Sequence, residues 1–98
     1  MHKITLRKRA AKEYLKAIVW YKERSLQAAE NFVKAVNETF SNIEAQPEHY
    51  RNTYKHFHEI KLKKYPYSLV YFIDNERNTV VVTTMFHSKR NPKKKFGR

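Results

Sequence analysis

Histidine is the side chain whose charge changes closest to neutral pH, and the chain has five of them. His87 ends a run of β-branched and aromatic residues and is followed by a basic segment. Its imidazole suits a general acid or base, although a strand-end histidine more often hydrogen-bonds the backbone. His56 and His58, two residues apart on an expected strand, would share one face and could begin a zinc site. The chain offers no cysteine and no evident third ligand, so we expect a surface pair and no metal.

The positive charge of the chain is concentrated in its second half. Lys and Arg number 21 against 9 Asp and Glu, which gives a formal net charge of +12. Residues 1–49 carry 9 basic and 6 acidic side chains, whereas residues 50–98 carry 12 and 3. Such a field attracts polyanions, which include nucleic acid, an anionic membrane and an acidic protein. The candidate binding residues are Lys61, Lys63, Lys64, Lys89, Arg90, Lys93, Lys94 and Lys95.

The lysines near residues 61–64 and those near residues 93–95 can each be interpreted in two ways. Four aromatic residues interleave with the first lysines and could stack nucleic-acid bases, but in a small sheet protein such rings are more often core; they are Tyr65, Tyr67, Tyr71 and Phe72. The last lysines fall in a basic segment, 89–98, that contains a proline and no acid. We expect this segment to be a loosely ordered tail, which either stays solvated or binds phosphates or an acidic protein.

Length and composition indicate one small domain that spans residues 1–98. The absence of cysteine fits a reducing compartment. The N-terminus has no apolar stretch of signal-peptide length, and apolar runs such as Leu69–Ile73 are too short to cross a bilayer. We therefore expect a cytoplasmic protein without a membrane partner.

Helical spacing dominates the first half of the chain. After a short alternating strand at 2–6, apolar residues recur every three or four positions over 9–24 and again over 26–46. Ser25 can cap the second helix and Pro47 ends it. Because the connection between them is short, we expect the two helices to form an antiparallel hairpin.

The period then changes to two, which is typical of strands. Strands are expected near 57–62, 68–74 and 79–86. The order β-α-α-β-β-β predicts an α+β fold in which the helix hairpin covers one face of a mainly antiparallel, four-stranded sheet. The opposite face is then free for a partner. We expect the core to contain Phe32, Val36, Phe40, Leu69, Tyr71 and Val82.

These elements and two short motifs resemble the RelE/ParE superfamily, the toxins of type II toxin–antitoxin (plasmid stabilisation) systems. The motifs are a Y-x-L-V-Y strand at residues 67–71 and an x-H-x-x-R-x-P ending at residues 86–92. Ala11 and Leu15 in the first helix, with Ala29, Phe32 and Pro47 around the second, follow the order seen in that superfamily. The resemblance covers about residues 4 to 92.

The resemblance implies a toxin with a curved antiparallel sheet under a helix hairpin, neutralised by an acidic antitoxin that wraps its helices and sheet. It implies no cofactor. Members similar to RelE cut mRNA in the ribosomal A site. Members similar to ParE poison DNA gyrase and are not known as nucleases.

The RelE-like catalytic residues carry over only in part. Metal-free RNA cleavage needs a base, an acid and cations around one phosphate. By resemblance, Lys61 matches a strand lysine and Arg90 or Lys89 the late cation, and His87 is the best remaining acid or base. However, Glu59 stands where a second lysine is usual, Ser68 replaces an arginine, and Phe96 falls near the place of a tyrosine.

We therefore expect a toxin neutralised by an acidic antitoxin, with a lean toward the ParE-like, non-nuclease mode. The first alternative is a ribosome-dependent mRNA endonuclease that uses Lys61, His87 and Arg90. The second alternative, from a different functional class, is a non-toxic basic module that binds nucleic acid.

Overall fold

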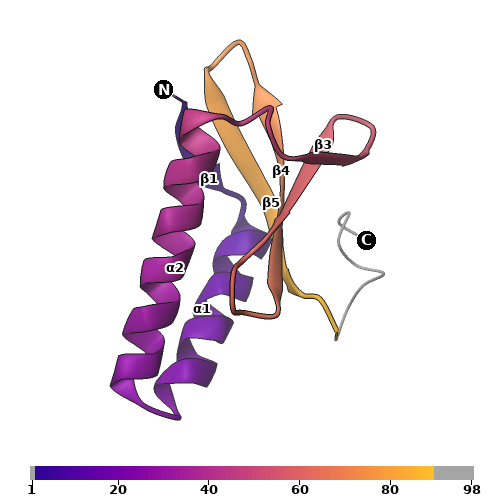
Figure 1. The fold of residues 1–98 in the computed structure, drawn as a ribbon. Helices are drawn as coiled ribbons and strands as arrows, with labels where there is room; N and C mark the ends of the chain where they lie inside the picture. The colour runs from indigo at the N-terminus through magenta and orange to yellow at the C-terminus, as the bar shows by residue number, and fades with distance from the viewer. Residues whose placement is uncertain (1, 90–98) are drawn as a thin grey trace.

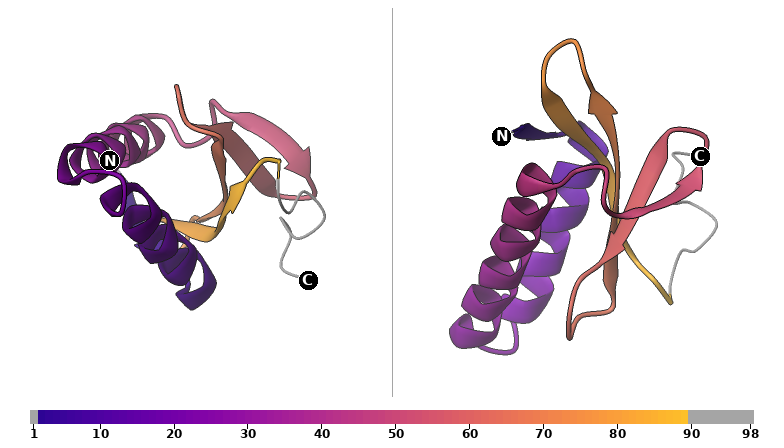
Figure 2. Two further views of the ribbon diagram at one scale, coloured as in Figure 1. Left: turned by 90° about the horizontal axis from the view of Figure 1, so that it is seen from below. Right: turned by 45° about the horizontal axis from the view of Figure 1, so that its top comes forward.

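The computed structural model describes residues 2–89, which form two layers (Figure 1). Both helices lie on the same side of the sheet, as the two views in Figure 2 also show. The α+β class and the helix hairpin on one face of the sheet are therefore confirmed. The elements are β1 (Lys3–Leu6), α1 (Lys8–Lys22), α2 (Leu26–Ala45), β2 (Arg51–Tyr54), β3 (Phe57–Lys61), β4 (Tyr67–Asp74) and β5 (Thr79–His87).

The described residues form a sheet of five strands, in the order β1-β5-β4-β3-β2, and not the four that we expected. The additional strand, β2, has the sequence Arg-Asn-Thr-Tyr and pairs with β3 at the edge of the sheet. It shows no apolar alternation because it is a short edge strand with little buried surface. Within the described sheet β1 pairs with β5 in parallel, and the other pairings are antiparallel.

The two helices begin differently. Arg7 precedes α1 and gives no side-chain cap, as the basic residues there predict. Ser25 caps α2, and its Oγ accepts a hydrogen bond from the Ala28 N–H at 2.9 Å, which pairs one of the free amides of a helix start. Only Glu23, Arg24 and the cap residue Ser25 separate α1 from α2. Because this connection is short, the helices lie antiparallel.

The core lies between the helix hairpin and the sheet. Five of the six expected core residues are buried: Phe32, Val36, Leu69, Tyr71 and Val82. Phe40 is only half-buried and packs at the margin, where its ring meets Tyr14 edge-on with centroids 6.5 Å apart. Tyr71 donates its buried hydroxyl to the Pro47 carbonyl at 2.6 Å, and burial raises the pKa of this phenol.

No helix within residues 2–89 is both long and apolar enough to cross a membrane.

Candidate functional site

A β-bulge in β5 determines on which face of the sheet the side chains at the end of this strand lie. Tyr71 pairs with Val82, but the preceding residue Val70 pairs with Thr84, so Thr83 is an extra residue. One extra residue reverses the alternation of every side chain that follows. His87 therefore pairs with Tyr67 on the face that carries the helices. Phe86, the residue before it, pairs with Ser68 on the opposite face.

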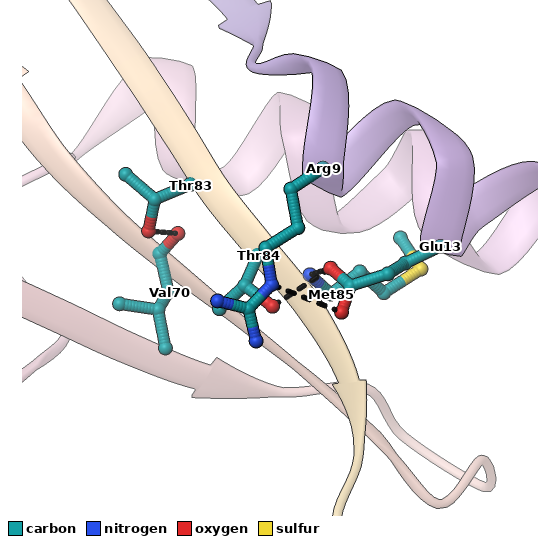
Figure 3. A network of polar contacts seen from close by, with 6 residues as sticks. All are labelled: Arg9, Glu13, Val70, Thr83, Thr84 and Met85. Atoms are coloured by element: carbon teal, nitrogen blue, oxygen red, sulfur yellow. Dashed lines mark hydrogen bonds and ion pairs between the residues drawn. The ribbon is translucent and has the colours of Figure 1, made fainter. Parts of the chain in front are cut away.

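Glu13 of α1 holds the bulge in place. One oxygen of its carboxylate accepts hydrogen bonds from the Thr84 hydroxyl at 2.7 Å and from the Met85 N–H at 2.9 Å. The other oxygen pairs with Arg9 at 3.4 Å (Figure 3). Thr83 donates its hydroxyl to the Val70 carbonyl at 3.2 Å. Glu13, which lies 71 positions before Thr84 in the sequence, thus supplies a hydrogen-bond acceptor to the polar groups of the bulge.

His87 lies half-buried at the end of β5, beside the helices. Its ring meets Tyr67 edge-on with centroids 5.2 Å apart, and Tyr67 in turn packs against Phe32 of α2 at 5.6 Å. The Lys89 N–H donates to Nδ1 of His87 at 3.2 Å. The neutral imidazole consequently carries its proton on Nε2. This geometry agrees with a histidine that hydrogen-bonds the backbone.

Lys61 lies on the other face of the sheet. It pairs with Ser68, which pairs with Phe86, and cross-strand partners point to the same side. Ser68 and Phe86 are buried, whereas Lys61 is exposed. The sheet register therefore separates Lys61 from His87, although the sequence suggested that the two act together.

The lysines of the β3–β4 turn and the start of the basic tail gather at one end of the sheet. Ser88 fixes this end, because its N–H and its hydroxyl both donate to the Pro66 carbonyl, at 2.8 and 3.1 Å. Lys63 and Lys64 lie in the turn and Lys89 follows the strand, all exposed. The remaining expected binding residues, Arg90, Lys93, Lys94 and Lys95, lie outside the described residues.

The two candidate histidines of the β2–β3 hairpin do not share a face. His58 stacks on the buried Tyr71 on the helix side and donates from Nδ1 to the Tyr50 carbonyl at 2.9 Å. His56 precedes the strand and stacks on Phe57, whose side chain points to the opposite side. Within residues 2–89 no group of three His, Cys, Asp or Glu side chains could hold a metal.

Most of the interleaved aromatic residues belong to the core. Tyr65 and Tyr67 pack on Phe32, and Tyr71 is fully buried. Phe72 differs, since it lies half-buried on the face away from the helices, with the Arg7 guanidinium 5.3 Å from its ring centroid.

With this geometry established, one comparison identifies the family. A family model described as the ParE toxin of the type II toxin–antitoxin system parDE matches residues 4–92. The chain belongs to the ParE toxin family. The match begins within β1 and ends beyond β5, so it includes the helix hairpin, β2 to β5 and His87.

Solved structures share the ParE-family fold at low sequence identity. A chain of the Pseudomonas aeruginosa chromosomal ParDE system is 13% identical with a TM-score of 0.73, over 89% of this chain and 96% of that one. The isolated Escherichia coli RelE toxin is 20% identical with a TM-score of 0.63, over 92% of this chain and 87% of RelE. No curated protein sequence matches the chain.

The structure also reveals an apolar groove on this ParE-family chain that the sequence did not indicate. It has a volume of about 660 Å³ and runs between α1 and α2, with Ile18, Ala29 and Val33 among its lining residues. Leu26, at its edge, is 63% exposed, and Leu15 of α1, which the helical spacing placed in the apolar stripe, is 61% exposed. Of these two leucines only Leu26 lines the groove. Helical periodicity alone does not distinguish an exposed leucine from a core one.

Proposed function

We propose that this member of the ParE family acts in the cytoplasm as a growth-inhibiting toxin that an acidic antitoxin neutralises. We further propose that it poisons DNA gyrase in the ParE-like, non-nuclease mode. The observation that supports this mode is the separation of Lys61 and His87 on opposite faces of the sheet.

The separation matters because RNA cleavage is concerted around one phosphate. The base, the acid and the cations must all reach the same group, at hydrogen-bond distance. On the Lys61 face its cross-strand neighbours are Ser68 and Phe86, which neither neutralise a phosphate nor exchange a proton near neutral pH. A gyrase poison needs no such arrangement and requires only a binding surface.

Two assays distinguish the proposed mode from mRNA cleavage. After induction in growing cells, primer extension should detect no new 5′ ends within mRNA, while purified gyrase should lose supercoiling activity when the purified chain is added. New mRNA ends that depend on ribosomes, with gyrase unaffected, would establish the endonuclease alternative. Normal growth after induction of the folded chain would exclude a toxin of either kind and favour the non-toxic binding module.

Variants give a second test of the mode. Replacing Lys93, Lys94 and Lys95 together with alanine should strongly reduce growth inhibition, because these charges suit a large anionic complex. His87→Ala should reduce it far less than the roughly 10²–10⁴-fold that loss of a general acid or base costs. Growth curves measure both effects, with circular dichroism as the control for folding. Growth inhibition that disappears with His87→Ala and survives the lysine replacements would contradict the proposal.

The antitoxin is proposed to bind along the groove between α1 and α2. The groove is open and mostly apolar, and an amphipathic segment can fill such a groove. The charged residues at its margin are of both signs, Lys22 and Lys34 with Glu30 and Glu38. Apolar contact would therefore supply most of the affinity, and the basic residues elsewhere would speed association with an acidic partner.

Leu26→Glu tests this docking site. Leu26 is 63% exposed and begins α2, so a carboxylate there should not impair folding. It should weaken antitoxin binding by about tenfold to a hundredfold, because it puts a charge into an apolar contact. Calorimetry with the antitoxin encoded beside the toxin gene provides the measurement. Gln27→Glu is the matched control, with a new charge at the adjacent exposed residue, which does not line the groove. Equal affinities of the two variants would exclude the groove.

A further inference from the structure

A second cavity adjoins the apolar groove, between α2 and the turn that joins β3 to β4. Its volume is about 430 Å³, and the charged residues that line it are Lys34, Lys63, Lys64 and Glu38. We call it the lysine cavity. Lys34 and Glu38 also line the apolar groove. Because the two cavities share these exposed residues of α2, they form one continuous surface that passes over the helix.

The turn that carries two of the lysines is held against the core on both sides. Leu62, just before them, is buried, and its N–H donates to the Tyr67 carbonyl at 2.9 Å. Tyr65, just after them, packs edge-on against Phe32 of α2 with ring centroids 5.2 Å apart. Lys64 itself has a left-handed backbone with φ of 67°, which is uncommon for a residue other than glycine. These contacts fix the backbone of the turn, so its lysines extend from defined positions beside α2.

The charge of the lysine cavity is unbalanced. Three ammonium groups line it against one carboxylate, that of Glu38. All four residues are exposed, and in the described part of the chain none of their side chains forms an ion pair or a hydrogen bond. Like charges around one cavity repel one another, and an anion among them relieves this repulsion. The cavity therefore favours a ligand that carries more than one negative charge.

The surroundings of the lysine cavity favour an acidic polypeptide over a nucleic acid. The adjoining groove is mostly apolar, so it suits the side chains of an amphipathic segment and offers nothing to a phosphate backbone. Tyr65 contributes to the cavity wall, but its ring is engaged with Phe32 and is not a platform for a base. A second copy of the chain is disfavoured, because each copy carries a net charge of +12.

We propose that one acidic polypeptide segment occupies the groove and the lysine cavity together. Its apolar side chains lie in the groove, and carboxylates that follow in the same segment bind Lys34, Lys63 and Lys64. The inference rests on the proposed function, since this segment belongs to the antitoxin. It gives the lysines of the β3–β4 turn a role after association: they hold the bound segment, in addition to attracting it.

Dissociation rates distinguish carboxylates that bind these lysines from general attraction by the charge of the chain. Lys63→Ala combined with Lys64→Ala removes two charges from the lysine cavity. Lys8→Ala combined with Lys12→Ala is the control, because it removes two charges from exposed positions of α1 that line neither cavity. Both pairs should slow association. Only the first should also raise the dissociation rate, by about threefold to tenfold, because the complex loses two ion pairs. Biolayer interferometry with the antitoxin encoded beside the toxin gene measures both rates.

A charge-conserving variant shows whether the effect comes from the charge. Lys63→Arg combined with Lys64→Arg keeps both positive charges and should dissociate at nearly the wild-type rate. Raising the salt concentration should reduce the difference between the alanine variant of the turn and the wild-type chain, since exposed ion pairs are screened. All the substituted positions are exposed, so every variant should keep the wild-type melting temperature.

The outcomes separate this inference from the proposed function. If the antitoxin binds the wild-type chain but dissociates equally fast from the two alanine pairs, the lysine cavity is not part of its binding site and the inference is overturned, while docking in the groove stands. An antitoxin that does not bind the wild-type chain would overturn the proposed neutralisation and this inference together. A single-stranded RNA that loses affinity for the Lys63 and Lys64 alanine variant, while the antitoxin dissociates from it at the wild-type rate, would assign the cavity to nucleic acid and also overturn the inference.

Discussion

Phe32→Ala is expected to lower the free energy of unfolding by about 3–5 kcal/mol. Phe32 is fully buried in α2 and lies at the centre of an aromatic cluster. Its ring centroid lies 6.0 Å from Tyr14 and 4.8 Å from Tyr21, both of α1. It lies 5.2 Å from Tyr65 and 5.6 Å from Tyr67, on the sheet side of the core. Alanine would leave a cavity where the helix hairpin meets the sheet.

Urea unfolding measures this loss, which is a large fraction of the roughly 5–15 kcal/mol that stabilises a typical domain. The melting temperature should fall by about 4–8 °C for each kcal/mol. Lys34→Ala, at an exposed position of the same helix, is the control and should change stability by less than about 0.5 kcal/mol. A loss below about 1 kcal/mol for Phe32→Ala would mean that the aromatic cluster is not the centre of the core.

Glu13→Ala is expected to destabilise the fold by about 2–4 kcal/mol, because it leaves the Thr84 hydroxyl and the Met85 N–H without their acceptor. The ion pair with Arg9 adds little, since both side chains are about one-third exposed, at 31% and 27%. Glu13→Gln retains an acceptor oxygen without the charge and should cost markedly less.

Hydrogen exchange at the Met85 amide reports on the bulge separately from overall stability. Protection of this amide should fall in the alanine variant and largely persist in the glutamine variant. Glu23→Ala, which removes an exposed carboxylate at the end of the same helix, is the control and should leave both measurements unchanged. If the glutamine variant were as unstable as the alanine variant, the carboxylate charge would outweigh its role as an acceptor.

The helices and the long strands of this fold could be predicted because their apolar residues repeat with a clear period. The apolar stripe of α2, which includes Phe32 and Val36, is buried as its helical spacing predicts. The β-branched residues of β4 and β5 also contribute buried side chains. β2 could not be predicted in this way. Its residues are exposed except for the half-buried Thr53, and pairing with β3 makes it a strand.

The candidate site was harder to predict because strand alternation alone gives the wrong face for the end of β5. Nothing at Thr83 or Thr84 resembles a glycine or proline signal for a bulge. The carboxylate that holds the bulge comes from Glu13, far away in the sequence. His87 was recognised as a candidate from its residue type, but its position relative to Lys61 depends on this long-range contact.

The parallel pairing of β1 with β5 has a consequence for the order of events during synthesis. Residues 3–6 pair with residues 79–82, so β1 has no partner strand until nearly all of the described sheet has been translated. The helix hairpin, whose contacts are local, can form much earlier. A ribosome that stalls before residue 79 would therefore carry a chain with its apolar groove already in place and its sheet unfinished. An antitoxin that recognises the hairpin would find its binding site before the toxin is complete.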